Sequence, residues 1–358
     1  MMSAQFVDVV RGWLDRHFAD EEAVYLVALV FAVVVLFATV GRMLTPCFVA
    51  LVIAFLLQGF VALLTRLGVR PRWAVVLTFA LFLGGLIMAV ILVLPLVFQQ
   101  TQALLTSLPA LVERLADGVS HLPARFPGLI TDEQIAGWTQ LAQNELGHFG
   151  QWFLQATITQ LPSLLGIVVY LVLVPTLVFF FLKDKDALLA LVFGLLPAHR
   201  PLLNRIGAEM SEQIAAYVRG KFIEVILLGG VTYAVFALFG LRYAVLLAVL
   251  VGLSAIVPIV GAALVTVPVA AVALLQWGGS SSFGYLLIAH LIIQALDGYV
   301  VVPLLFSEAV DLHPVLIIVA VLFFGGIWGI WGIFFAIPLA ALVKAIYRAW
   351  PRTAAMPV

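Results

Sequence analysis

The sequence predicts an all-α polytopic membrane protein with about eight transmembrane helices, broken or re-entrant segments and interfacial helices. Of its 358 residues 65% are hydrophobic and 10% are charged, and the mean hydropathy is +1.21. Soluble domains contain about 45–50% apolar and about 25% charged residues. The apolar residues are also gathered in runs of about 20, the length with which a helix crosses a bilayer core.

Eight uncharged or nearly uncharged runs are long enough to span a bilayer. The sixth and the eighth are long for a single span, and the sixth contains Pro258, Gly261 and Pro268. A proline inside a helix costs about 3 kcal/mol, because it removes a donor and clashes with the preceding turn. We therefore expect the sixth run to bend or partly re-enter. The runs are Ala23–Val40, Met43–Leu64, Trp73–Phe98, Leu164–Leu182, Phe222–Phe239, Tyr243–Trp277, Phe283–Phe306 and Val315–Val343.

Lysine and arginine in short loops predict the orientation of the spans. The loop after the second span holds Arg66, Arg70 and Arg72 without an acid, and both the segment 183–221 and the C-terminal tail are basic. These parts are expected to be cytoplasmic. Acids outnumber bases between the third and fourth spans, which predicts an external segment there and places both termini in the cytoplasm.

The spans divide the chain into seven segments. Apolar residues at helical spacing predict a short helix on the membrane surface before the first span, and amphipathic helices in the external segment. The predicted segments are 1–22 (N-terminal interfacial helix), 23–98 (spans one to three), 99–163 (external amphipathic helices), 164–182 (span four), 183–221 (cytoplasmic helical hairpin), 222–347 (spans five to eight, the candidate transport core) and 348–358 (cytoplasmic tail).

The sequence contains no motif for catalysis, metal binding or nucleotide binding. Its six histidines are isolated, Cys47 is the single cysteine, and neither HExxH nor CxxC occurs. The glycine-rich run Gly325–Gly332 lacks the P-loop lysine and is better explained by close helix packing. Eighteen basic and eighteen acidic residues cancel, so no net field attracts nucleic acid. We expect no enzyme activity, no catalytic or metal-ligating residues, no cofactor, no nucleic-acid partner and no ATP-driven pumping by this chain alone.

Polar residues inside the spans are the candidate functional residues, since each is costly in hydrocarbon. In the seventh span His290, Gln294 and Asp297 share one helical face. Such a face would line a water-filled path, with Asp297 binding a proton or a cation. The alternative is a hydrogen-bonded stripe that only fixes helix packing. For Glu224 in the fifth span, the simplest interpretation is a carboxylate paired with Lys221 near the cytoplasmic boundary.

A weak internal repeat accompanies the broken sixth run. A shift of 71 positions places residues 241–261 on residues 312–332, and a proline follows in both copies, at Pro268 and Pro338. Repeats whose helices are interrupted at matching positions point to the binding region of a transporter. Replacing Pro258 and Gly261 by alanine is therefore expected to leave folding intact and to reduce transport. The identical pairs are Leu241/Leu312, Ile256/Ile327, Ile259/Ile330 and Gly261/Gly332.

Several motifs, in their order along the chain, resemble one known family. They are FFFLKDKD (Phe179–Asp186), LLP (Leu195–Pro197), YVRGK (Tyr217–Lys221), IVPIVG (Ile256–Gly261), and the block from Gln294 through VVVPLLF, DLHP and FFGGIWGIWGIFFAIP. Over nearly the whole chain this series resembles the autoinducer-2 exporter family of bacterial permeases. One departure is that Gly298 follows Asp297, where the family more often has asparagine after the acid.

The resemblance implies an eight-span protein of the bacterial inner membrane that assembles as a homo-oligomer, with a pentamer as the implied size. Members export small solutes such as autoinducer-2, and others are described as sodium- or lithium-coupled proton antiporters. Neither substrate is chosen by the resemblance.

Residues and resemblance together predict a secondary transporter that exports a small polar solute or exchanges Na⁺ or Li⁺ for H⁺. Its partners would be that solute, a proton or sodium ion, the lipid bilayer and further copies of the chain. The alternative is an oligomeric membrane scaffold for envelope partners, without transport. The candidate path and coupling residues are Asp297, Gln294, His290, Glu224, Pro258, Gly261, Pro268 and Pro338.

Overall fold

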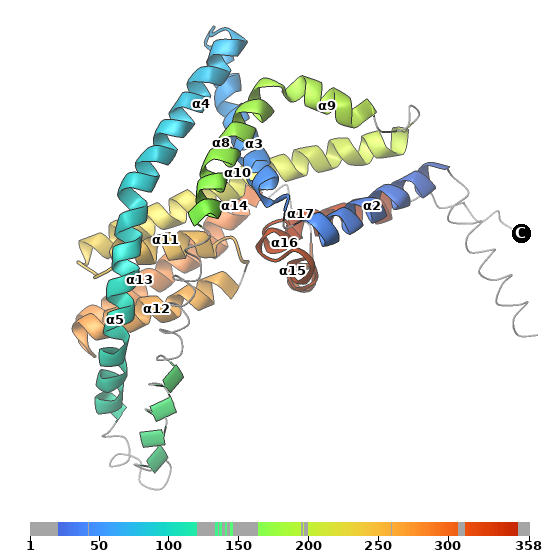
Figure 1. Ribbon diagram of the computed structural model, residues 1–358. Coiled ribbons are helices and arrows are strands. Elements are labelled where there is room, and N and C mark those ends of the chain that lie inside the picture. Colours follow the sequence, from blue (N-terminus) through green and yellow to red (C-terminus); the bar gives the residue numbers. More distant parts are fainter. Residues whose placement is uncertain are drawn as a thin grey trace, which may run out of the picture. The chain divides into compact units, whose positions relative to one another are not determined.

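The computed structural model describes residues 21–41, 43–119, 133–134, 136–137, 140–141, 144–145, 164–194, 196, 200–258, 260–306 and 312–349. All regular secondary structure in these residues is helical (Figure 1), which confirms the all-α polytopic class. The predicted surface helix falls almost entirely outside them. By length and composition, five segments of the described part of the chain could cross a membrane: Thr45–Arg66, Pro71–Ser107, Leu203–Leu238, Val260–Trp277 and Ser281–Phe306. The shorter apolar helices are Val169–Lys183, Ala244–Ser254 and Pro314–Trp328.

The helices differ from the predicted runs at two places. The second helix of the predicted cytoplasmic hairpin continues into the fifth span as one helix, and the third span continues into the external segment. The elements are α2 (Glu21–Val40), α3 (Thr45–Arg66), α4 (Pro71–Met88), η1 (Ala89–Val93), α5 (Leu94–Val119), α8 (Leu164–Lys183), α9 (Lys185–Gly194), α10 (Pro201–Leu238), α11 (Ala244–Ser254), α12 (Val260–Trp277), α13 (Ser281–Leu296), η3 (Asp297–Val301), α14 (Val302–Phe306), α15 (Pro314–Trp328), α16 (Ile330–Phe334) and α17 (Ala336–Ala349).

Two of these elements, η1 and η3, are single π-helical turns, and each ends two residues before a proline. Pro95 and Pro303 have no N–H to donate to the carbonyl four residues earlier, and their rings crowd that carbonyl. A wider π turn accommodates this disruption within a helix that otherwise continues. As a result Asp297 is the first residue of a π turn inside the seventh span.

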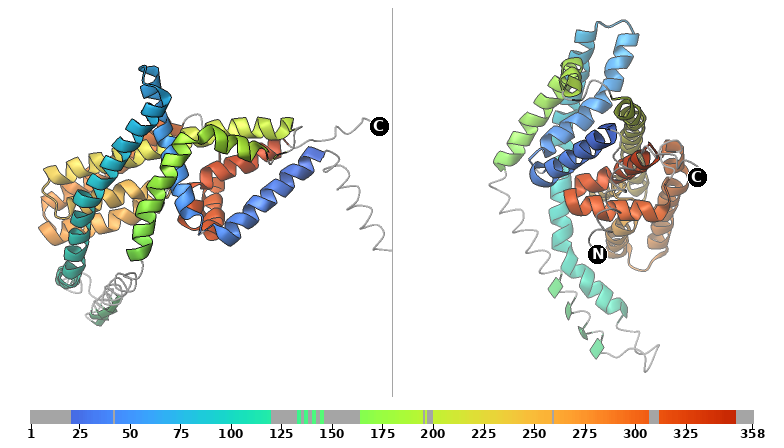
Figure 2. Two further views of the ribbon diagram at one scale, coloured as in Figure 1. Left: turned by 45° about the horizontal axis from the view of Figure 1, so that its top comes forward. Right: turned by 90° about the vertical axis from the view of Figure 1, so that its right-hand side faces the viewer.

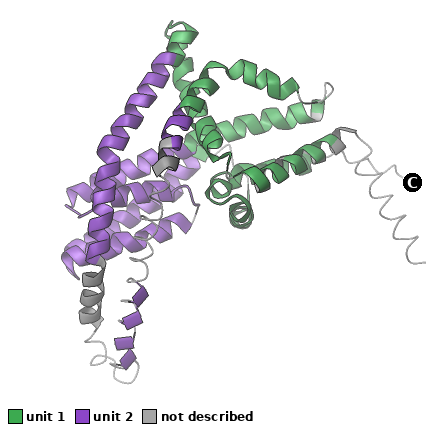
Figure 3. Ribbon diagram, in the orientation of Figure 1, with its two compact units in different colours: residues 1–75, 176–220, 305–358 green, residues 76–175, 221–304 purple. Residues whose placement is uncertain are grey.

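The chain forms two compact units (Figure 3). Unit 1 comprises residues 1–75, 176–220 and 305–358, and unit 2 comprises residues 76–175 and 221–304.

Unit 2 is built on α11, α12 and α13, which pack in that order, while α5 packs on α11 and α12 (Figures 1 and 2). Two polar contacts fix α5 to the start of α11. The hydroxyl of Tyr243 donates to the carbonyl of Ala103 (3.3 Å), and the amide of Leu246 donates to Oε1 of Gln100 (2.9 Å). The apolar core is formed by Leu228, Phe236, Leu241, Leu247, Val251, Val265, Val269, Val272, Ala273, Leu286 and Ile293.

The sixth run is broken, as expected, into α11 and α12, which pack against each other as a hairpin. In the connecting turn the amide of Val260 donates to the carbonyl of Pro258 (2.7 Å). Gly261 is buried, and a Cβ at this position would collide with the carbonyl oxygen of Ser254. Only glycine permits such a close approach. The structure therefore changes one expectation, because Gly261→Ala cannot leave the hairpin undisturbed.

Unit 1 contains a break of the same construction. The eighth run divides into α15, α16 and α17, and Gly329 between the first two has φ +62°. Gly332 is buried, and a Cβ there would collide with the carbonyl oxygen of Phe324. Gly332 is the residue that the 71-position shift pairs with Gly261. Each glycine thus lies against a carbonyl seven or eight positions earlier, which supports the internal repeat.

Candidate transport site

The site in unit 2 begins where α10 and α11 cross at two glycines. A Cβ on Gly252 would lie 2.8 Å from the carbonyl oxygen of Val225 and 3.1 Å from the Cα of Gly229. Small residues allow membrane helices to approach this closely. The crossing brings Val225, and with it the neighbouring Glu224, beside the end of α11, where the broken segment begins.

A buried ion pair of the site lies on α10. Nζ of Lys221 is 2.8 Å from Oε2 of Glu224, and the two side chains are 5% and 2% exposed. This is the pairing that the simplest interpretation of Glu224 expected. Removing two charges from water is costly, and the cost is offset only when each charge keeps its partner. The two residues therefore act as a unit, and replacing one removes the partner that offsets the buried charge of the other.

The helix α13 also contributes to the site, and a hydrogen bond between Thr266 and His290 holds it to α12. Oγ1 of Thr266 lies 2.7 Å from the carbonyl oxygen of Ala262 and 3.1 Å from Nε2 of His290. A hydroxyl has one proton, and the shorter contact assigns it to Ala262, so Oγ1 accepts from the Nε2–H of His290. The imidazole is fully buried against Phe236. Its Nδ1 is buried without a hydrogen-bond partner among the described residues.

The same hydrogen bond shows which parts of α12 and α13 are level with each other. The two helices pack together and are joined by a short turn at residues 278–280, so they run antiparallel. From the Thr266–His290 contact, five residues back along α12 lead to Gly261, and four to seven residues forward lead to Gln294 and Asp297. Because the rise per residue is equal in both helices, the break and the polar face lie at the same depth.

Two polar atoms at this depth have no hydrogen-bond partner in the described part of the chain. They are Oδ1 of Asp297 and Nε2 of Gln294, and both are buried. Nearly all buried polar atoms in proteins are hydrogen-bonded, and leaving one unsatisfied costs about 1–3 kcal/mol. Asp297 also interacts electrostatically with Lys221 and with Glu224. The site therefore combines one ammonium, two carboxylates, an amide and a broken helix, and it begins at a π turn, a feature frequent at functional sites.

The other two predicted residues lie elsewhere. Pro268 is inside α12, two residues after Thr266, while Pro338 is buried in α17 and belongs to unit 1. Sequence reasoning did not include Lys221, Thr266, Gly229 or Gly252 among the site residues. For the glycines a signal existed, since both stand in otherwise apolar runs, but nothing in the sequence indicated that they face each other.

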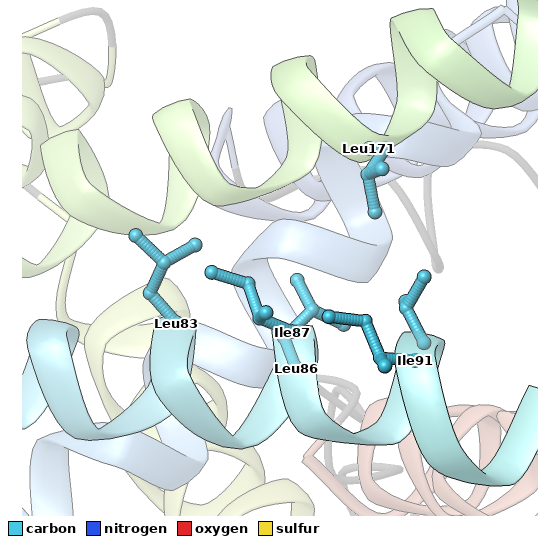
Figure 4. Close-up of a pocket in the computed structure, with 6 residues that line it drawn as sticks. Leu83, Leu86, Ile87, Ile91 and Leu171 are labelled. Atoms are coloured by element: carbon cyan, nitrogen blue, oxygen red, sulfur yellow. The ribbon is translucent and has the colours of Figure 1, made fainter.

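A cavity of about 260 Å³ lies between the helix α4–η1 and α8 in unit 2 (Figure 4). Its lining is entirely aliphatic, so no side chain there could orient a polar solute. Among the described residues no group of three His, Cys, Asp or Glu side chains could hold a metal ion. The polar site at Asp297 is therefore the candidate for function. The cavity is lined by Leu83, Leu86, Ile87, Val90, Ile91 and Leu171.

Membrane-spanning helices, broken spans and unsatisfied polar atoms at the depth of a break are features typical of polytopic membrane permeases. The chain belongs to the family described as "AI-2E family transporter", which matches residues 25–352. It is 42% identical over 345 residues to the "Putative permease PerM" of Escherichia coli (strain K12), covering 96% of this chain and 98% of that relative. It is 26% identical over 316 residues to the "Putative transport protein YueF" of Bacillus subtilis (strain 168), covering 86% and 84%. The family resemblance seen in the motifs is thus confirmed.

Proposed function

We propose that the protein is a secondary transporter that exports a small polar solute, such as autoinducer-2, or exchanges Na⁺ or Li⁺ for H⁺, and that Asp297 binds the coupling proton or cation. The observation that carries this proposal is the buried Oδ1 of Asp297, which lacks a hydrogen-bond partner among the described residues at the depth of the α11–α12 break. A carboxylate oxygen inside a span, without a donor, is a natural position for a proton or an alkali ion.

The break contributes backbone groups to the same region. In the turn from Ala255 to Pro258 the chain leaves the regular helical hydrogen-bond ladder. Carbonyl oxygens freed in this way are used by transporters to coordinate ions at mid-membrane. Irregular backbone is tolerated at that depth only where protein or a cavity covers it. We therefore assign the turn to the path and expect it to move during transport.

We also propose that the protein lies in the bacterial inner membrane with both termini in the cytoplasm. Thr65 should then be on the cytoplasmic side and Thr139 outside. In a Cys47→Ser background, an impermeant thiol reagent added to intact cells should label Thr139→Cys and leave Thr65→Cys unlabelled. Labelling of Thr65→Cys alone would reverse the orientation.

The second candidate function is an oligomeric scaffold without transport. It is favoured by the span Pro71–Ser107. The most apolar 18-residue stretch of this span has no residue buried against the rest of the described chain. Such a surface can face lipid or other copies of the protein, and a homo-oligomer, of which a pentamer is the size implied by the resemblance, would use it. In the scaffold, the polar face around Asp297 would only fix helix packing.

Purified protein in liposomes separates the two candidates. Internal pH is followed with a trapped dye after a jump in external NaCl or LiCl, with choline chloride as the control salt, and export of trapped autoinducer-2 is followed under an imposed pH gradient. The transporter produces cation-dependent proton movement or proton-driven export that protein-free liposomes lack. Liposomes with correctly assembled protein that show neither flux would support the scaffold.

A further inference from the structure

We propose that Glu224 is a positioning residue that holds Lys221 away from Asp297, so that the site keeps one unbalanced negative charge and takes up a single monovalent cation. The inference rests on the proposed role of Asp297 in cation or proton binding. It starts from one asymmetry. The ammonium of Lys221 contacts Oε2 of Glu224 at 2.8 Å, while Oδ1 of Asp297, although buried, has no hydrogen-bond partner among the described residues.

The charges of the site explain why that asymmetry matters. Lys221 and Glu224 carry opposite charges and pair with each other, so the three groups together keep one net negative charge, that of Asp297. An unpaired charge is strongly disfavoured away from water, so the site is stable when one proton or one alkali ion joins it. A divalent ion would reverse the imbalance. The geometry thus favours H⁺, Na⁺ or Li⁺, one at a time.

No other described group on the helices packed around Asp297 supplies a second positive charge of lysine type. The sequence of α12 contains no titratable residue, and α13 carries Tyr285 and His290. Tyr285 is exposed, as is Tyr299 in η3. His290 is fully buried and bonded to Thr266. On α10 the groups that act on Asp297 are the Lys221–Glu224 pair itself.

Without Glu224, the side chain of Lys221 could pair with Asp297, and lysine is well suited to such a change of partner. Its ammonium is a compact charge on a flexible four-carbon stem. Besides Glu224, Lys221 interacts electrostatically with the carboxylate of Asp297, which is therefore open to it if Glu224 is neutralised. Lys221 would then occupy the position intended for the transported cation and exclude it. Glu224→Gln should therefore abolish cation binding, although Glu224 itself does not bind the cation.

A second substitution distinguishes this positioning role from direct coordination. In Lys221→Met/Glu224→Gln the competing ammonium is gone, and Asp297 is again the single charge of the site. Cation binding should return. If Glu224 were a ligand of the cation, the double variant would stay inactive. The double variant is also the one most expected to fold, because replacing both members of a buried ion pair is far better tolerated than replacing one.

The experiment measures binding without transport. Full-length protein in detergent, in weakly buffered solution between mildly acidic and neutral pH, receives NaCl or LiCl, with choline chloride as the control, and released protons are read with a pH dye. If proton and alkali ion compete for one site, the wild type releases up to about one proton per protomer. Asp297→Asn releases none, and Glu224→Gln falls at least about tenfold below the wild type. Lys221→Met/Glu224→Gln returns to within about twofold of the wild type, a difference worth under half a kcal/mol.

Each part of the proposal is contradicted by a different result. Wild-type release by Glu224→Gln, or absence of release by a correctly assembled double variant, would overturn the positioning role. A wild type that releases no proton would contradict the uptake of Na⁺ or Li⁺ by this site in place of a proton. Release that persists in Asp297→Asn would contradict the proposed function, whatever Glu224 does. If the predicted pattern holds but liposomes show no flux, the positioning role stands and transport does not.

Discussion

Gly261→Ala tests whether the α11–α12 hairpin requires a residue without a Cβ at this position. The new Cβ would collide with the carbonyl oxygen of Ser254 and lie 2.8 Å from its carbonyl carbon. These are backbone atoms, so no side-chain rotation relieves the clash. Overpacking costs about 1–3 kcal/mol, whereas alanine in place of glycine within a helix gains about 0.5–1 kcal/mol. Because the new Cβ meets backbone atoms, the upper part of the range of overpacking costs applies. We therefore expect the free energy of unfolding to fall by about 2 kcal/mol.

The matched control is Gly230→Ala on α10 of the same unit, where a Cβ would meet nothing within 4 Å. This variant should be unchanged or more stable by up to about 1 kcal/mol. Equilibrium unfolding in mixed detergent micelles, followed by circular dichroism, compares the two directly. If Gly261→Ala is as stable as Gly230→Ala, the close approach of α11 and α12 is not required, and our account of the break is wrong.

Three further outcomes are expected in the same unfolding assay. Thr266→Val leaves the buried Nε2–H of His290 without an acceptor and should cost about 1–3 kcal/mol, while Thr266→Ser keeps the acceptor and should cost less. Tyr217→Phe removes the hydrogen bond to the carbonyl of Phe334 (2.9 Å) in unit 1 and should cost about 0.5–1.5 kcal/mol. Gly332→Ala should lose about 2 kcal/mol, like its counterpart in unit 2, since its Cβ also collides with backbone; an unaffected Gly332→Ala would count against the repeat.

The helical spans could be predicted from the sequence because hydrocarbon leaves a chain few alternatives. An apolar run of about 20 residues must satisfy its backbone internally, which makes it a helix. The break in the sixth run was also predictable, because Pro258 and the following Gly261 make a continuous helix costly there. The continuity of α10 was not predictable, because the polar residues that precede Phe222 mark where the apolar run begins but not whether the second helix of the predicted hairpin ends there.

The two π turns could not be predicted from the sequence. Both precede a proline, and a proline alone predicts only that one hydrogen bond is lost. Whether the helix ends, kinks or widens depends on what packs beside it. The sequence therefore indicated that Asp297 lies on a polar face, but it could not place this residue at the start of a π turn.

The candidate site was predictable where it depends on spacing and not where it depends on contact. His290, Gln294 and Asp297 share a face because of helical periodicity alone. The crossing of Gly229 and Gly252 and the bond from His290 to Thr266 are contacts between helices, which no local pattern encodes. The role proposed for Lys221 likewise depends on its interaction with Asp297 in η3, which the spacing along α10 does not encode.

Flux as a function of pH in liposomes containing Asp297→Asn, beside the wild type, tests the central claim most directly. Asparagine keeps the shape and hydrogen-bonding capacity of the side chain but removes its charge. We expect cation- or pH-dependent flux to fall to the level of protein-free liposomes, with oligomer size in detergent unchanged. His290→Gln, on the same face, should shift the pH optimum of flux with less effect on its maximal rate. Wild-type flux and pH dependence in Asp297→Asn would contradict the coupling role of this residue and favour the scaffold.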